Sequence, residues 1–117
     1  MKILVVEDNA LIAMEHEMLI EDLGHDCVAI ATTSARAREA ARAEAPDVAL
    51  VDLGLADGWT GPALIEELHG MGIVSVVVSG QVEDYQAPDH VLSVLTKPLR
   101  GDLLPAILRD FSIRSGR

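Results

Sequence analysis

The chain has 117 residues, half of them hydrophobic, which suits one domain with a full core of its own. Its formal net charge of −10 at pH 7 repels nucleic acid phosphates and anionic membranes, so neither is an expected partner. Cys27 is the only cysteine, which excludes a disulfide framework and favours a buried thiol in a reducing, cytoplasmic setting. No apolar run resembles an export signal or a membrane span.

Apolar runs alternate with helix-forming segments along the whole chain. Asn9, Thr33 or Ser34, and Asp102 are placed to cap helices. In chain order the expected elements are a strand at 3–6, a helix at 10–23, a strand at 27–31, a helix at 34–44, strands at 48–52 and 74–79 around a helix at 62–69, a strand at 91–96, and a last helix after residue 102. Residues 80–90 offer one helical turn at best.

This alternation predicts a doubly wound α/β fold, in which helices cover both faces of a five-stranded parallel sheet. Such sheets bind ligands outside the carboxyl ends of their strands, where the strand order reverses. Five polar residues stand at or just after those ends, namely Glu7, Asp8, Asp52, Ser79 and Lys97. We therefore expect these five residues to share one edge of the sheet.

Three carboxylates at one edge repel each other, so the site needs a cation unless one carboxyl stays protonated. Mg²⁺ takes oxygen ligands and is commonly held by one or two carboxylates together with a phosphate. Lys97 and Ser79 supply a positive charge and a hydroxyl suited to the oxygens of a phosphoryl group. Asp52 is the expected nucleophile that forms an acyl phosphate. Asp47 precedes its strand and Asp57 lies too far into the loop, so both are poorer candidates.

Four short motifs occupy these strand ends in order. They are Val5-Val6-Glu7-Asp8-Asn9, Val51-Asp52-Leu53, Val78-Ser79-Gly80 and Thr96-Lys97-Pro98. Together they resemble the motifs of the response-regulator receiver domain, over residues 2–111. The resemblance implies a flavodoxin-like sheet of order 2-1-3-4-5, an Asp52 phosphorylated by a histidine kinase or phosphotransfer protein, and a cis Lys97-Pro98 bond. It also implies Mg²⁺ held by Asp8, Asp52 and the Gly54 backbone carbonyl, with Glu7 acting through water.

Two features depart from the family pattern. Val94 stands three residues before Lys97, where the family usually has a Tyr or Phe that rotates as a switch. Residues 80–90 are few for the usual fourth helix, which is expected to be short or absent. Any switch should instead reorder this stretch as Ser79 and Lys97 move toward the phosphoryl group.

The first helix carries two apolar stripes at about 100° per residue. One stripe consists of Ile12, Leu19, Ile20 and Leu23, and the other of Leu11, Met14 and Met18. The second stripe is either covered by neighbouring segments or a docking surface. The family resemblance favours docking of the kinase or phosphotransfer protein there.

Three more apolar or aromatic features carry expectations. His16 falls within the core stripe of the first helix, where a partly buried, hydrogen-bonded histidine is expected. Trp59 follows Asp52 in the loop and is expected to be partly exposed. The last helix has one apolar face, formed by Leu103, Leu104, Ile107, Leu108 and Phe111.

We therefore predict one receiver domain over residues 1–117, without an output domain, that signals through partners or acts as a phosphate sink. It is not expected to be an enzyme beyond its own phosphorylation and dephosphorylation. The output partner is not identified by the sequence, and a homodimer stays open. The alternatives are a pseudo-receiver that is never phosphorylated and an aspartyl-nucleophile phosphatase. The phosphatase is disfavoured because Gly54 stands where such sites carry a second Asp.

Overall fold

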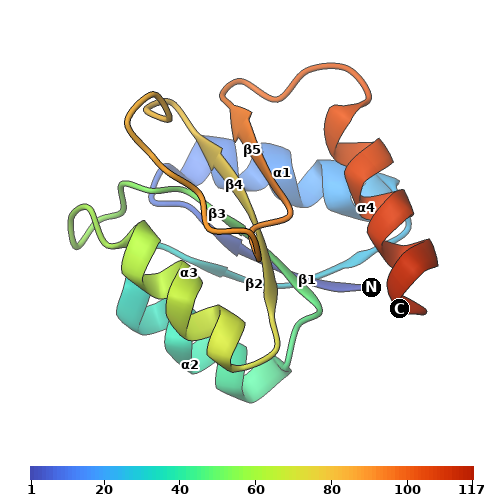
Figure 1. The fold of residues 1–117 in the computed structure, drawn as a ribbon, viewed down its shortest axis with the longest axis horizontal. Coiled ribbons are helices and arrows are strands. Elements are labelled where there is room, and N and C mark those ends of the chain that lie inside the picture. Colours follow the sequence, from blue (N-terminus) through green and yellow to red (C-terminus); the bar gives the residue numbers. More distant parts are fainter.

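Five parallel strands form a single sheet in the order β2-β1-β3-β4-β5 (Figure 1). The strands are β1 (Lys2–Val6), β2 (Asp26–Ala31), β3 (Val48–Val51), β4 (Val74–Ser79) and β5 (Ser93–Thr96). The structure is a computed structural model and describes residues 1–117. The strand order and the parallel pairing confirm the predicted flavodoxin-like sheet.

Four helices cover the two faces of this sheet, two on each side (Figure 1). They are α1 (Ala10–Asp22), α2 (Ser34–Glu44), α3 (Gly61–Gly70) and α4 (Leu103–Ser115). The core under α2 and α3 is built around side chains such as Ala37, Leu64 and Leu68. The core under α1 and α4 includes Ile20 and Leu108. None of these helices has both the length and the apolar character that a membrane crossing requires.

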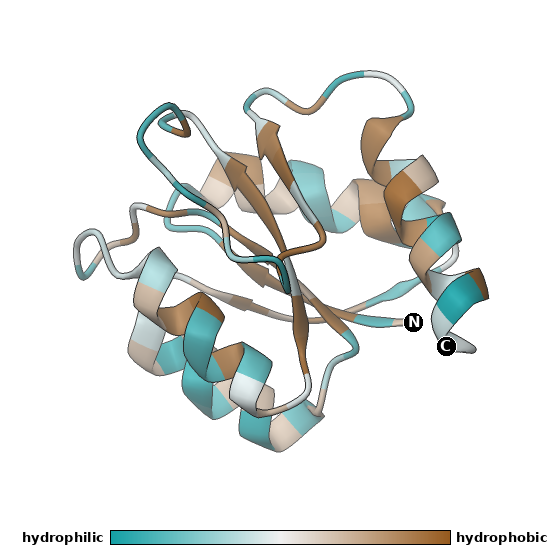
Figure 2. Cartoon of the chain, viewed as in Figure 1, coloured by the Kyte–Doolittle hydropathy of each residue, from teal (hydrophilic) through white to brown (hydrophobic).

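The central strands are apolar along their whole length because both of their faces are covered. Every residue of β3 is buried, and β1 is buried after Lys2. Figure 2 shows these strands in the brown of hydrophobic residues, whereas α2 and α3 carry many hydrophilic residues. Each fully buried aliphatic side chain contributes roughly 1.5–3 kcal/mol, so this layer anchors the strand ends that follow it.

The helix ends follow the predicted signals with one exception. The Asn9 side chain accepts hydrogen bonds from the backbone N–H groups of Leu11 and Ile12, at 3.0 and 3.1 Å, and Thr33 caps α2 in the same way. Asp102 occupies the N-cap position of α4, but its side chain accepts no hydrogen bond there. The capping role predicted for this carboxylate is therefore wrong, although the helix does begin after it.

The connection between β4 and β5 contains no helix, which confirms the expectation for residues 80–90. The strand that follows is shorter than predicted. The Val91 N–H donates to the Pro88 carbonyl and closes a turn, so β5 begins only at Ser93. In place of a fourth crossover helix, an irregular segment joins the two strands.

Two residues of the predicted apolar faces lie outside the core. Leu23 follows the last residue of α1 and is partly exposed, since the helix ends at Asp22. Leu103 is exposed because it lies about 100° around α4 from Leu104, which takes the buried position. The other residues assigned to the α4 face are buried or half-buried, as predicted.

Candidate functional site

The register of the sheet brings the predicted acidic residues side by side. The Asp52 N–H donates to the Val6 carbonyl at 3.0 Å, which continues the β1–β3 pairing by one residue. The Glu7 N–H donates to the Ala31 carbonyl at 2.9 Å and extends the β1–β2 pairing in the same way. Asp52 and Glu7 therefore leave the sheet at the same edge, held by backbone hydrogen bonds.

Lys97 forms an ion pair with both of these carboxylates. Its Nζ lies 2.6 Å from Asp52 Oδ2 and also contacts Glu7 Oε1. Asp52 is 8% exposed and Glu7 is 1% exposed, so the pairs lie in a region that holds little water. Burial lowers the pKa of Lys97, but the contacts with Asp52 and Glu7 outweigh it and leave the pKa raised. Lys97 is therefore a fixed cation at this edge.

Glu7 is the most deeply buried charge of the group. Its Oε2 accepts a hydrogen bond from the Asn9 N–H at 3.0 Å. Its Oε1 touches the Lys97 ammonium but lacks a well-directed hydrogen bond. Burial is the largest influence on this carboxyl and raises its pKa, although Lys97 and the Asn9 N–H oppose the rise. Glu7 Oε1 can therefore accept a further ligand.

The three carboxylates are close enough to hold one cation. Glu7, Asp8 and Asp52 each offer an oxygen, and these oxygens lie within 4.8 Å of one another. Asp8 is exposed, so a cation bound here would keep contact with water. Oxygen-only donors, an open side and an under-coordinated Glu7 Oε1 all fit Mg²⁺, which keeps several waters in protein sites.

Ser79 ends β4 next to the lysine. Its carbonyl accepts from the Lys97 N–H at 3.0 Å, and its buried hydroxyl accepts a long hydrogen bond of 3.4 Å from the Gln81 N–H. The Lys97-Pro98 peptide bond is cis, as the resemblance implied. The four strand ends thus bring together every polar residue that the sequence assigned to this edge.

The loop between β3 and α3 is held by Asp57. Its carboxylate accepts hydrogen bonds from the Ser34 hydroxyl at 2.6 Å and from the Thr60 hydroxyl at 2.7 Å. These hydrogen bonds lower the pKa of Asp57, and the bond from the Ser34 hydroxyl has the largest effect. Asp57 is therefore a structural residue of this loop. Its position far into the loop had made it a poorer candidate for the nucleophile, but its partner Ser34, which lies 23 residues earlier in the chain, was not predicted.

Close packing at two glycines, Gly54 and Gly61, shapes this loop. The Trp59 ring packs over Gly54, so that a Cβ at Gly54 would meet the indole carbons at 3.6 Å. Gly61 begins α3 directly against the backbone of Asp52 and Leu53, where a Cβ would lie 2.8 Å from the Leu53 carbonyl oxygen. From the sequence only the Gly54 carbonyl was expected at the site, and neither the packing of Trp59 over Gly54 nor the close approach at Gly61 was predicted.

A cavity of about 460 Å³ lies between α1 and the segment that begins at Lys97. Its lining residues are Ile12, Glu15, His16, Leu19, Lys97, Pro98 and Leu99. His16 is buried there and makes no hydrogen bond to another residue, so the prediction of a partly buried histidine hydrogen-bonded within the protein is wrong. Burial, followed by the nearby positive charge of Lys97, lowers the pKa of His16.

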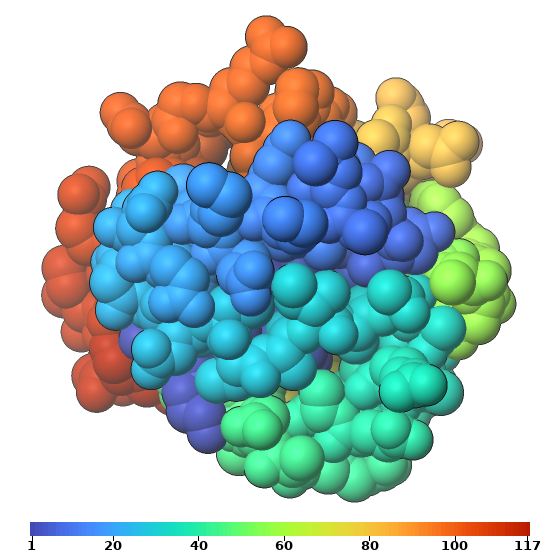
Figure 3. Space-filling view, turned by 180° about the vertical axis from the view of Figure 1, so that it is seen from behind, coloured from blue at the N-terminus to red at the C-terminus, as the bar shows by residue number.

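The second apolar stripe of α1 is uncovered. Leu11, Met14 and Met18 are 67%, 54% and 63% exposed, respectively. Figure 3 shows α1 running across one face of the molecule with its outer surface open. Cover by neighbouring segments, one of the two alternatives that the sequence left open, is therefore wrong for this chain.

The sequence model of the response regulator receiver domain matches residues 3–109. The chain belongs to this family. Receiver domains are signalling domains of two-component systems and in general bind Mg²⁺ at an acidic site, interact with kinases or phosphotransfer proteins, and are not enzymes of metabolism. This chain has an acidic cluster, formed by Glu7, Asp8 and Asp52, at the carboxyl edge of its sheet.

Similar proteins carry the same domain. The chain is 36% identical over 104 residues to the transcriptional regulatory protein PhoP of Escherichia coli, an overlap of 84% of this chain and 46% of PhoP. It is 40% identical over 68 residues to the phyllosphere-induced regulator PhyR of Methylorubrum extorquens, which is 57% of this chain and 26% of that regulator. The receiver domain thus spans less than half the length of these curated relatives.

The fold also matches solved receiver domains. The receiver domain of PhyR from Erythrobacter litoralis superposes with a TM-score of 0.81 at 29% identity, and the match covers 93% of this chain and 87% of that domain. The agreement extends across the five-stranded sheet and the helices on both of its faces.

Proposed function

We propose that this receiver domain is a cytoplasmic phosphoacceptor that takes a phosphoryl group onto Asp52 from a histidine kinase or a histidine phosphotransfer protein. The observation that carries the proposal is the position of Asp52 at the site edge. Lys97 holds Oδ2 at 2.6 Å, whereas Oδ1 accepts no hydrogen bond and is not sealed in the interior. Oδ1 is therefore the free oxygen for attack on phosphorus.

The transfer exchanges one bond to phosphorus for another. Asp52 Oδ1 forms the new O–P bond while the N–P bond of the donor phosphohistidine breaks, and the imidazole leaves with the electron pair. Lys97 would offset the charge of the phosphoryl oxygens and the Ser79 hydroxyl would donate a hydrogen bond to one of them; the Lys97–Asp52 ion pair supports this role of the lysine.

Glu7, Asp8, Asp52 and the Gly54 carbonyl are the proposed holders of Mg²⁺. When bound, the ion offsets the charge of the carboxylates and of the phosphoryl group. Glu7 supports this assignment because its Oε1 is buried without a hydrogen-bond partner and one of its carboxylate oxygens lies within 4.8 Å of an oxygen of Asp8 and of Asp52. Gly54 lies directly beneath the Trp59 ring, which a Cβ at this position would contact at 3.6 Å.

The signal is proposed to leave the site through residues 80–92. Val94 is half-buried against the core under α2 and α3 and has no ring to rotate. The Ser79 hydroxyl, by contrast, is joined directly to the Gln81 N–H at the start of the irregular segment. A phosphoryl group that draws this hydroxyl inward would pull on the segment and change the surface that partners meet.

Acetyl phosphate labelling tests the proposal. The purified domain, incubated with Mg²⁺ and acetyl phosphate, should acquire an acid-labile phosphoryl group that is absent from Asp52→Asn. Asp47→Asn is the matched control, because Asp47 lies at the opposite edge of the sheet, where it accepts from the Lys2 N–H. Label retained on Asp52→Asn would sink the assignment. Wild-type protein that no acetyl phosphate or histidine kinase can label would be a pseudo-receiver.

A further inference from the structure

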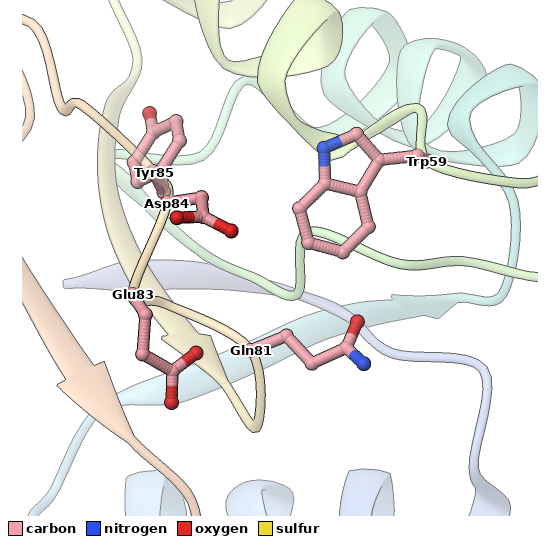
Figure 4. A pocket seen from close by; sticks show the side chains of 5 residues that line it. All are labelled: Trp59, Gln81, Glu83, Asp84 and Tyr85. Atoms are coloured by element: carbon pink, nitrogen blue, oxygen red, sulfur yellow. The ribbon is translucent and has the colours of Figure 1, made fainter.

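A cavity of about 520 Å³ opens beside the phosphoacceptor edge. Its lining residues are Trp59, Gln81, Glu83, Asp84 and Tyr85. Figure 4 shows Trp59, from the loop after β3, on one side of the cavity and the four residues of the irregular segment opposite it. The Asp84 carboxylate turns toward the indole ring in this view. The cavity therefore places an aromatic face across from carboxylates.

The two carboxylates of this cavity have no cation of their own. None of the ion pairs or side-chain hydrogen bonds in the structure involves Glu83 or Asp84. Trp59 is 54% exposed, although it is the largest apolar side chain in the protein. Two uncompensated negative charges next to an open indole ring form a surface complementary to a cation with a flat, weakly hydrated face.

We propose that this cavity binds the guanidinium group of an arginine side chain from a partner protein. An arginine can stack its plane on the Trp59 ring while its N–H groups donate to the Asp84 and Glu83 carboxylates. The Gln81 side-chain amide lines the same cavity and offers a further acceptor. The net charge of −10 also favours the approach of a basic partner surface. A lysine would satisfy the charge but not the planar, forked geometry.

Both walls of the cavity touch residues of the phosphoacceptor site. The Trp59 ring packs over Gly54, and the Gln81 N–H donates to Ser79 Oγ at 3.4 Å. A bound arginine and a phosphorylated Asp52 would therefore act on the same two contacts, which makes their effects reciprocal. This link rests on the proposed function, whereas the arginine pocket itself does not.

The single tryptophan makes the pocket directly testable, because the indole N–H of Trp59 gives one resonance in a ¹H–¹⁵N spectrum. The probe is the capped tripeptide acetyl-Gly-Arg-Gly-amide, titrated into the unphosphorylated domain. Its matched control contains citrulline, which has the same shape without the charge. The arginine peptide should shift the Trp59 resonance saturably. The citrulline peptide, and a third peptide with lysine in place of arginine, should bind at least about tenfold more weakly.

Paired variants separate the pocket from general attraction to an acidic protein. Glu83→Gln with Asp84→Asn should weaken arginine peptide binding at least about tenfold, since both charge-assisted acceptors are lost. Glu39→Gln with Asp22→Asn removes the same two charges from exposed positions on α2 and α1 and should change binding less than about twofold. An equal loss in both double variants, or an equal response to citrulline, would overturn the pocket.

Addition of Mg²⁺ and beryllofluoride, a phosphoryl mimic, then tests the link. The affinity for the arginine peptide should change in the wild-type domain and stay constant in Asp52→Asn. An unchanged affinity in a domain that acetyl phosphate does label would show that the link is wrong while Asp52 remains the phosphoacceptor. Failure of labelling together with normal peptide binding would instead reject the proposed function and leave the pocket in place.

Discussion

Lys97 bridges Asp52 and Glu7 at the carboxyl edge of the sheet, with its ammonium group 2.6 Å from Asp52 Oδ2 and in contact with Glu7 Oε1. Asp8, the third carboxylate, makes no ion pair with the lysine and remains exposed. One lysine charge therefore faces the two buried carboxylates of Glu7 and Asp52, and the carboxylate of Asp8 lies on the open side of the site. Lys97, which we propose to act in phosphoryl transfer, is therefore also expected to stabilise the fold.

Lys97→Met should destabilise the domain by about 3 kcal/mol without Mg²⁺, because removing one partner of a buried ion pair leaves the carboxylates uncompensated. Mg²⁺ should restore more stability in this variant than in the wild-type protein, since the ion would supply the missing charge. Urea unfolding with and without Mg²⁺ measures both effects. Lys2→Met, at the only other lysine, is the control and should change stability by less than about 0.5 kcal/mol. Equal losses in the two variants would contradict the role of the pair.

Gly61→Ala should destabilise the domain by at least about 3 kcal/mol, because its Cβ would collide with backbone atoms of Asp52 and Leu53 that cannot move without shifting Asp52, the proposed phosphoacceptor. Gly70→Ala, at the other end of the same helix, meets no atom within 4 Å and should stabilise by about 0.5–1 kcal/mol. Thermal unfolding of the two variants gives the comparison. A stable Gly61→Ala variant that is labelled by acetyl phosphate at the normal rate would contradict this contact.

The sequence predicted the sheet and the site edge well for a common physical reason. Uniformly apolar runs that end on Asp52 or Lys97 report burial on both faces and the point where the chain emerges, and both signals are local. The partners of Asp57 and the packing of Trp59 over Gly54 depend on how separate loops meet. A local sequence pattern carries no information on contacts between separate loops, so these two contacts could not be predicted from the sequence.

His16 shows the same limit within one helix. Its spacing placed it correctly on the inner side of α1, but not in a cavity without a hydrogen-bond partner. Leu103 was predicted to be buried but is exposed, because a hydrophobic residue in the first turn of a helix can lie beyond the edge of the buried stripe. Helical periodicity fixes the side that a residue takes, but not what the rest of the fold places in front of it.

The domain should lose stability as the pH falls below about 6.5, in part because of His16. Burial lowers the pKa of His16 in the folded state, so the unfolded chain binds a proton more readily and acid favours unfolding. The loss begins at the unfolded pKa of 6.5 and grows until the pH passes below the folded pKa. Urea unfolding between pH 7.5 and 5 should show a shallower decline in His16→Gln.

His25 adds a separate contribution of the same sign, because burial and the N-terminal ammonium lower its pKa. His25→Asn should therefore remove a second part of the decline, and the double variant should have the flattest profile. NMR titration of the His16 ring in the folded domain provides an independent measurement. A folded pKa at or above 6.5 would contradict the effect of burial in this cavity.

The exposed stripe of Leu11, Met14 and Met18 should determine how fast a kinase transfers phosphate to this domain. Apolar side chains at an interface centre carry much of the binding energy, so Met14→Glu with Met18→Glu should slow transfer by at least about tenfold. The rate of acetyl phosphate labelling should stay unchanged, because these side chains are exposed on α1 and none of them belongs to the acidic cluster. Transfer is measured with whichever of a panel of purified histidine kinases labels the wild-type domain fastest.

Met71→Glu is the matched control for the stripe, since it adds one acidic group at a partly exposed methionine beyond the end of α3. Kinase transfer to this variant should proceed within about twofold of the wild-type rate. A similar slowing in Met71→Glu would indicate that added negative charge alone repels the kinase. Equal loss of kinase transfer and acetyl phosphate labelling in the stripe variant would indicate damage to the site and exclude a docking role for α1.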